Sequence, residues 1–92
     1  MKSRRSPAFR KLFRDLPPDV KRQAYASYRL FALNPHHPSL HFKKLHEKLY
    51  SVRVGSHHRA LGIVDNPDLV IWIWIGSHAE YDKLIKRLIK GK

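Results

Sequence analysis

The stretch Val70–Leu84, VIWIWIGSHAEYDKL, opens with six apolar residues and changes character at Gly76. A run that is apolar at every position, rather than at alternate positions, is typical of a strand inside a sheet with both faces covered. Ser77 then begins a Ser-x-x-Glu pattern, in which the serine and the glutamate cap the first turn of a helix. The stretch therefore predicts an interior strand that leads directly into a helix, with His78 at the helix start.

Further strands are expected before this one. Residues 50–55, YSVRVG, alternate between apolar and polar side chains, which is typical of a strand with one buried face. Residues 59–65, RALGIVD, form the next strand, and Asp-Asn-Pro-Asp at 65–68 is a dense turn signal. A short strand over residues 41–45 is also expected, after a loop with two prolines. Because short turns join the last three strands, we expect them to form an antiparallel meander.

The first third of the chain predicts a helical hairpin. Ser6-Pro7 suits a helix start, and Pro17-Pro18 ends that helix. Its apolar side chains fall on one stripe, at Phe9, Leu12, Phe13 and Leu16. A second helix begins near Asp19 and ends at Asn34-Pro35. The expected fold is α+β, one domain over residues 1–92, with the hairpin packed on a small three- to four-stranded antiparallel sheet and a C-terminal helix.

The chain is strongly basic. Its 92 residues include 19 Lys and Arg against 7 Asp and Glu, a formal net charge of +12. Residues 1–49 hold twelve of these cations and three of the acids. Such a surplus opposes compaction by self-repulsion and is typical of a protein with a polyanionic partner. Nucleic acid is the first candidate and membrane phosphate the second, while an acidic protein partner is compatible with either.

Composition also bears on where the protein works. The absence of cysteine excludes a disulfide scaffold or a thiolate metal site. The N-terminal residues are basic without the apolar core of a signal peptide. The longest apolar run, Leu69–Ile75, is far too short to span a bilayer. We therefore expect a soluble, cytoplasmic protein with no membrane partner.

A candidate site lies where the apolar strand ends. Backbone amides at a helix start lack partners within the helix, so a phosphate could dock beside His78 and the helix field favours its neutral imidazole. Tyr81 rises from the same helix face. Arg53 points away from the apolar side of its strand, and Arg59 lies on the adjacent strand. Arginine can grip phosphate oxygens, histidine can move a proton and an aromatic ring can stack a base, which together suit phosphodiester chemistry.

Each of these residues also has a plainer interpretation. His78 could be an exposed turn residue, and both arginines could be the polar face of an antiparallel sheet. Arg59 shares its alternation with Leu61 and Ile63, so we expect that it needs a bulge or a strand end to reach the groove. The cationic helix positions could be solvated faces.

Two other features are not expected to form sites. Trp72 and Trp74 are interpreted as core residues rather than base-stacking platforms. The pairs His36-His37 and His57-His58 suggest zinc, but adjacent side chains on extended backbone point to opposite faces and no carboxylate companion is suitably spaced. We therefore expect no metal and no cofactor.

Three blocks of the sequence resemble a known family. The blocks are residues 6–45, with LPP and NPHHPSLHFK; YSVRVGSHHRALG at 50–62; and IWIWIGSHAEYDKL at 71–84. In this order they resemble the RelE/ParE superfamily of type II toxin–antitoxin toxins, over roughly residues 6–85. The resemblance implies a microbial RNase-like arrangement of a helical hairpin on an antiparallel sheet. Many members cleave mRNA in the ribosomal A site, where the ribose 2′-OH attacks the adjacent phosphate without a metal ion.

The resemblance also implies roles for individual residues. Arg53 matches a basic strand position that contacts the RNA backbone, and Arg59 matches the arginine that stabilises the phosphate during attack. His78 falls where some cleaving members have a catalytic histidine. Tyr81 matches a side chain that orients or stacks the substrate base.

Other positions match less closely or depart from the family. Lys43 and Lys44 lie where the family places basic residues near the groove, which makes them candidate RNA-binding residues. Ser51 stands where RelE-like cleavers often have a lysine. The edge strand that often opens the family is expected to be short or absent.

Three functions therefore remain open. The first is a ribosome-dependent mRNA endoribonuclease, with ribosomal RNA and mRNA as partners. The second is a ParE-type toxin that poisons DNA gyrase and needs no nuclease centre. The third is a basic RNA-binding module without catalysis. The resemblance implies a cognate antitoxin for the first two, with an acidic, amphipathic segment that the positive surface would attract. In its absence we expect a monomer.

Overall fold

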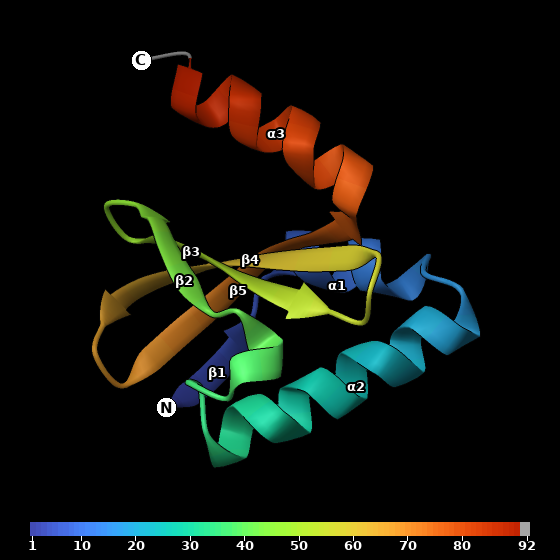
Figure 1. The fold of residues 1–92 in the computed structure, drawn as a ribbon, viewed down its shortest axis with the longest axis horizontal. Coiled ribbons are helices and arrows are strands. Elements are labelled where there is room, and N and C mark those ends of the chain that lie inside the picture. The colour runs from blue at the N-terminus through green and yellow to red at the C-terminus, as the bar shows by residue number, and fades with distance from the viewer. Residues whose placement is uncertain (91–92) are drawn as a thin grey trace.

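The computed structural model describes residues 1–90, which form three α-helices and one five-stranded sheet (Figure 1). The elements in chain order are β1 (Lys2–Arg5), α1 (Pro7–Arg14), α2 (Pro18–Leu33), the 3₁₀ turn η1 (Pro38–Leu40), β2 (Lys43–His46), β3 (Leu49–Val54), β4 (His58–Asn66), β5 (Leu69–Ser77) and α3 (His78–Lys90). The strand order is β1-β5-β4-β3-β2. The α+β class, the helical hairpin and the C-terminal helix are confirmed.

The number and direction of the strands differ from the prediction. The sheet has five strands and is mixed, because the short strand β1 pairs in parallel with β5. Its sequence, KSRR, has no apolar alternation, so the pattern could not indicate a strand. Backbone bonds hold it in place: the Lys2 N–H donates to the Asp68 carbonyl at 2.7 Å and the Ser6 N–H to the Trp72 carbonyl at 3.0 Å. Strand β1 makes β5 an interior strand, as its apolar run predicted.

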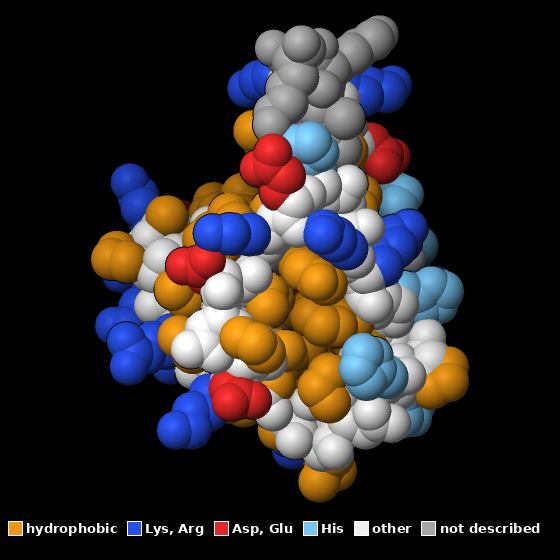
Figure 2. All heavy atoms as spheres, turned by 90° about the vertical axis from the view of Figure 1, so that its left-hand side faces the viewer, with side chains coloured by type: hydrophobic (Ala, Val, Ile, Leu, Met, Phe, Trp, Pro, Cys, Tyr) orange, Lys and Arg blue, Asp and Glu red, His pale blue; other side chains and the backbone are white. Residues whose placement is uncertain are grey.

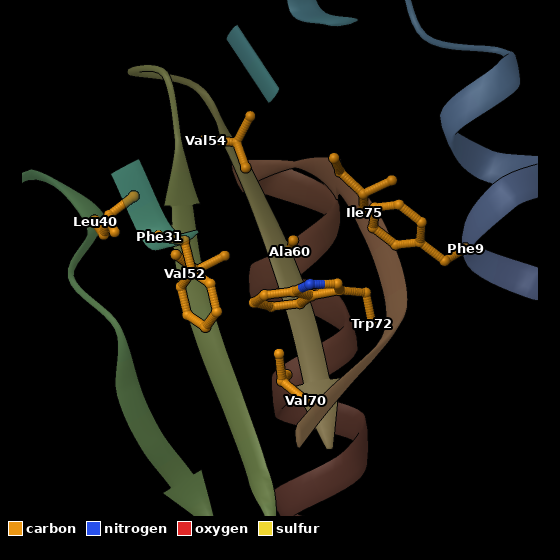
Figure 3. Close-up of a cluster of buried hydrophobic side chains, with 9 residues drawn as sticks. All are labelled: Phe9, Phe31, Leu40, Val52, Val54, Ala60, Val70, Trp72 and Ile75. Carbon is orange, nitrogen blue, oxygen red and sulfur yellow. The ribbon is translucent and has the colours of Figure 1, made fainter. Parts of the chain in front are cut away.

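The hydrophobic core lies between the helical hairpin and one face of the sheet. Figure 3 shows side chains from α1, α2 and the strands converging around Trp72. Phe31 on α2 is 2% exposed, and its ring meets the Trp72 ring nearly edge-on with 5.3 Å between centroids. We call this side of the sheet the covered face, defined by Val52, Val54, Ala60, Trp72 and Ile75. The alternate residues form the open face, defined by Ser51, Arg53, Arg59, Leu61 and Trp74.

A bulge lets β5 serve both faces. Leu61 pairs with Trp74 and Gly62 with Trp72, so Ile73 is an extra residue between two pairs. Trp72 and Ile75 therefore share the covered face although they are three residues apart. Trp72 is a core residue, as predicted, whereas Trp74 is only partly buried, on the open face.

The helix α3 begins with the predicted capping box. The Glu80 N–H donates to the Ser77 hydroxyl oxygen at 3.1 Å, and the Ser77 N–H donates to a Glu80 carboxylate oxygen at 3.0 Å. These two bonds satisfy amides that have no partner inside the helix. Figure 1 shows α3 on the opposite side of the sheet from α1 and α2. The capping box therefore ends β5 and starts α3 beside the open face.

Candidate active site

Two arginines face each other across the open face. Arg53 on β3 and Arg59 on β4 are directly paired in register, and both are partly buried. The sequence predicts that Arg59 needs a bulge or a strand end to reach this side, and Arg59 is the second residue of β4, with no bulge beside it. Leu61, which shares its alternation, is fully buried on the open face rather than in the core beneath the helices. The pairing therefore places both guanidinium groups on one surface without any irregularity in β4 at this point.

His78 lies beside Arg59 at the start of α3. Its backbone N–H donates to the His57 carbonyl at 2.7 Å, which fixes the chain where it leaves β5. The Arg59 Nε donates to His78 Nδ1 at 3.5 Å, and Asp82 Oδ2 lies 3.5 Å from His78 Nε2. A guanidinium can only donate, so Nδ1 must present a lone pair and Nε2 carries the proton. In this arrangement the Nδ1 side of the His78 ring faces Arg59 and the Nε2 side faces Asp82.

The Tyr81 ring lies against both His78 and Arg59. Its side chain is buried, with the residue 8% exposed. Its ring stacks on the His78 ring with 5.9 Å between centroids, and the Arg59 Cζ lies 5.6 Å from the centre of the Tyr81 ring. A cation over an aromatic face is attracted by the ring. Little of the ring is left for stacking a base, and its contacts orient Arg59 and His78.

The structure adds a histidine that the sequence reasoning missed. His41 Nε2 lies 3.4 Å from Arg53 Nη1, on the side of Arg53 away from its cross-strand partner. His41 follows η1 in a left-handed backbone conformation, with φ 48°. The long-range contact with Arg53 leaves no local pattern. The one available signal is its position between two apolar residues, Leu40 and Phe42, which pack on the core.

The two candidate lysines take different places. Lys43 pairs with Ser51, so it lies on the open face, one strand beyond the arginines. Lys44 pairs with Tyr50, whose ring packs against Phe42, and it lies on the opposite side of the sheet. The register therefore brings Lys43, and not Lys44, toward the arginine pair.

The electrostatics of the arginine pair favour an anion. Directly opposed like charges destabilise a sheet unless something compensates them. Neither Arg53 nor Arg59 forms an ion pair with an acid of the part of the chain that the structure describes. The Arg59 Nη1 atom is buried and has no hydrogen-bond partner among those residues. A phosphate between the two guanidiniums would offset this repulsion.

The two neighbouring acids, Glu80 and Asp82, interact with Ser77 and His78 rather than with the arginines. The hydrogen bonds from the Ser77 backbone and hydroxyl hold the pKa of the Glu80 carboxyl below its ordinary value of 4.5. Asp82 reaches the site only through its contact with His78. The site is therefore a cationic surface in which the Asp82 carboxylate contacts His78 and not the arginines.

Other features lie away from this site. A cavity of about 310 Å³ lies on the covered face, lined by core residues that include Phe9, Phe31 and Trp72. It is apolar and holds none of the candidate residues. His37 accepts a hydrogen bond from the Ser39 N–H and so caps η1. Among residues 1–88, no group of three or more His, Asp or Glu is placed to hold a metal ion. No described helix is long and apolar enough to cross a membrane.

The fold and sequence were compared with known proteins. The family model of the ParE-like toxin domain matches residues 18–83, more than two thirds of the chain. No curated protein sequence matched. The RelB–RelE antitoxin–toxin complex from Methanococcus jannaschii is similar with a TM-score of 0.68 and 19% identity, over 87% of this chain and 96% of that one.

Two further structures share the fold. The isolated E. coli RelE toxin matches with a TM-score of 0.64 and 17% identity, over 95% of this chain and 97% of that one. The RelBE2 toxin–antitoxin complex from Mycobacterium tuberculosis matches with a TM-score of 0.58 and 23% identity, over 85% and 91%. At these identities the likeness shows the fold, and the family model shows the kinship. The chain belongs to the ParE-like toxin domain family, within the RelE/ParE superfamily of toxins.

Proposed function

We propose that the protein is a ribosome-dependent mRNA endoribonuclease that arrests translation. The observation that carries this proposal is the opposed pair Arg53–Arg59 with the His78 imidazole in contact with Arg59. A phosphodiester needs two things in order to be cleaved by its own 2′-OH: donors for the charge that builds on phosphorus, and a base for the hydroxyl proton. The open face supplies both within one cluster.

Each residue then has a role. Arg53 and Arg59 hold the non-bridging oxygens of the scissile phosphate. His78 Nδ1 removes the proton of the 2′-OH, and Asp82 stabilises the imidazolium that forms. Tyr81 positions both groups from beneath. The reaction as proposed uses no metal ion.

We propose that the remaining positive charge binds the protein to ribosomal RNA. Nine cations on β1, α1 and α2 form no ion pair with a described residue: Lys2, Arg4, Arg5, Arg10, Lys11, Arg14, Lys21, Arg22 and Arg29. Figure 2 shows many Lys and Arg side chains along one edge of the molecule and others in a band across its middle, while most histidines lie toward the opposite edge. Contacts with phosphates release counterions, so association with ribosomes should weaken steeply as salt rises.

A cognate antitoxin is the second proposed partner. The apolar edge of α3 is progressively uncovered: Tyr81 is buried, Leu84 and Ile85 are partly buried and Leu88 is 45% exposed. An acidic, amphipathic segment would cover this edge and meet the +12 charge of the chain. Two of the similar structures are antitoxin–toxin complexes, which supports this proposal.

Induced expression with genome-wide mapping of mRNA 5′ ends tests the activity. The wild-type chain should produce new ends inside codons of translated messages, and His78→Ala should not, at equal protein level. The matched control is His57→Ala, an exposed histidine of the preceding turn that should cleave like wild type. Growth arrest that persists in both Arg59→Ala and His78→Ala would refute the proposal.

Gyrase poisoning is the second candidate, and the match to a ParE-like family model favours it. If the protein poisons gyrase, the same experiment should show DNA damage with intact transcripts. The third candidate, a non-catalytic RNA-binding module, would bind RNA but yield no new ends even when translating ribosomes are supplied.

A further inference from the structure

Two imidazole–guanidinium contacts lie side by side on the open face, because their arginines are cross-strand partners. His41 contacts Arg53, Arg53 pairs in register with Arg59, and Arg59 contacts His78. Each guanidinium thus has an imidazole on its outer side. Because guanidiniums only donate, the acceptor atoms are His41 Nε2 and His78 Nδ1. Each imidazole therefore directs a nitrogen lone pair at its own arginine, and a phosphate held by both arginines would have one imidazole on either side.

The position of His41 is fixed although its side chain is exposed. On one side Leu40 is 1% exposed, and on the other Phe42 packs edge-on against Phe31 with 5.0 Å between ring centroids. The chain between these two anchors turns through a left-handed conformation at His41. Non-glycine residues adopt this conformation rarely, and such residues gather at functional sites. The anchored turn places the exposed imidazole within reach of Arg53.

We propose that His41 is a second catalytic residue, the general acid that protonates the leaving group. This inference rests on the proposed nuclease function and supplies what that function still lacks. Cleavage by the 2′-OH expels a 5′ oxygen, which is a poor leaving group unless it receives a proton. A base alone cannot provide that proton. Two imidazoles on either side of a phosphate clamp divide the two transfers between them.

The step balances as follows. His78 Nδ1 takes the 2′-OH proton, and the electron pair left on the 2′ oxygen forms the new bond to phosphorus. The bond from phosphorus to the 5′ oxygen breaks, and that oxygen keeps its electron pair and takes the proton from His41 Nε2. Before the step, the phosphate takes over the guanidinium donors that had faced the two imidazoles, which frees the lone pairs of His78 Nδ1 and His41 Nε2. His41 Nε2 then binds a proton from water, so His41 enters the step as an imidazolium and leaves it neutral. The products are a 2′,3′-cyclic phosphate and a 5′-hydroxyl.

A substrate that needs no general acid isolates this role. In a 5′-bridging phosphorothiolate mRNA, sulfur replaces the 5′ oxygen at the cleavage site, and a thiolate leaves without a proton. Single-turnover cleavage of ribosome-bound mRNA would be measured at saturating toxin with the oxygen and the sulfur substrates. His41→Ala should lose about 100-fold or more on the oxygen substrate and less than about tenfold on the sulfur substrate. His78→Ala should stay defective on both, since the 2′-OH still needs its base.

Two further variants make the test specific. His41→Gln keeps an acceptor for Arg53 but cannot transfer a proton, so it should behave like His41→Ala. His36→Ala removes another exposed histidine of the same loop and should match wild type on both substrates. Circular dichroism and thermal unfolding confirm that each variant is folded.

The outcomes separate this inference from the proposed function. If the wild-type protein cleaves neither substrate, both the nuclease function and the role of His41 are refuted. Wild-type cleavage with full activity in His41→Ala would leave the nuclease standing and overturn the role of His41. Equal defects of His41→Ala on the two substrates, or an active His41→Gln, would show that His41 only holds Arg53 and would also overturn it.

Discussion

The two faces of the sheet use the same strands for opposite purposes. On β3, Val52 and Val54 are 5% and 3% exposed beneath the helical hairpin, while Arg53 between them carries a charge on the other side. The covered face is aromatic and aliphatic, and the hairpin removes it from water. The open face pairs two guanidiniums with each other. Because side chains alternate along a strand, stability and chemistry can occupy neighbouring residues without competing for space.

This separation implies that substitutions should divide into two classes. Changes on the covered face should lower the free energy of unfolding and reduce activity only through loss of folded protein. Changes at the arginine pair should reduce cleavage in a protein that remains folded. The following predictions test that division.

Trp72→Ala is expected to have the largest effect. It removes the indole at the centre of the core, and the resulting cavity and lost contacts should lower the free energy of unfolding by about 3–5 kcal/mol. Urea denaturation measures this. Leu33→Ala, at a position 85% exposed, is the control and should stay within about 0.5 kcal/mol of wild type. A loss below 1 kcal/mol for Trp72→Ala would mean that the covered face does not carry the stability.

Arg59→Ala should come next, with its effect on activity rather than on stability. Removing one preorganised donor from a transition state typically costs about 2.7–4 kcal/mol, or roughly 10²–10³ in rate. Ribosome-dependent cleavage measures the rate, and urea denaturation of the same sample should show little change. If Arg59→Ala unfolded the protein as Trp72→Ala does, the two faces would not be independent.

Gly62→Ala probes the closest packing on the covered face. A Cβ there would lie 2.6 Å from Val70 Cγ2 and 2.9 Å from the Trp72 ring, so buried side chains would have to move. Overpacking of this kind costs about 1–3 kcal/mol. The comparison is Ser56→Ala in an exposed turn, which should be nearly neutral in the same urea titration. Equal stability of the two variants would show that the side chains around Gly62 can move to make room for a methyl group without loss of stability.

The smallest effect should come from acidification at the start of α3. The hydrogen bonds from Ser77 lower the pKa of Glu80 in the folded chain, so its contribution is present above the ordinary value of 4.5 and is lost as pH falls through the lowered value. Glu80→Gln does not titrate. The stability difference between wild type and Glu80→Gln should therefore shrink as pH is lowered from 7 to below 4.5 in urea titrations. A difference that does not change with pH would contradict the role of this carboxylate.

Local patterns predicted much of the fold and part of the site. The capping box at Ser77, the Pro-Pro break and the alternation of β3 each depend on a few consecutive residues, and all three appear as expected. His78 and Arg53 were identified because a helix start and a strand face are local properties. The residue pattern did not indicate strand β1, because its pairing is made by backbone groups that its polar sequence does not reveal, and the family resemblance left open whether this edge strand is short or absent.

The composition of the chain and the periodicity of its residues predicted the order of the elements after β1, the basic charge, and a candidate site with Arg53, Arg59, His78 and Tyr81. The three-dimensional packing determined which of these groups meet. The register of β3 and β4 sets Arg59 opposite Arg53, on the face where Leu61 is buried, and His41 reaches Arg53 across a separation of twelve residues. Such contacts depend on strand register and on anchored turns, which arise from the whole sheet and core at once and not from any single stretch of sequence.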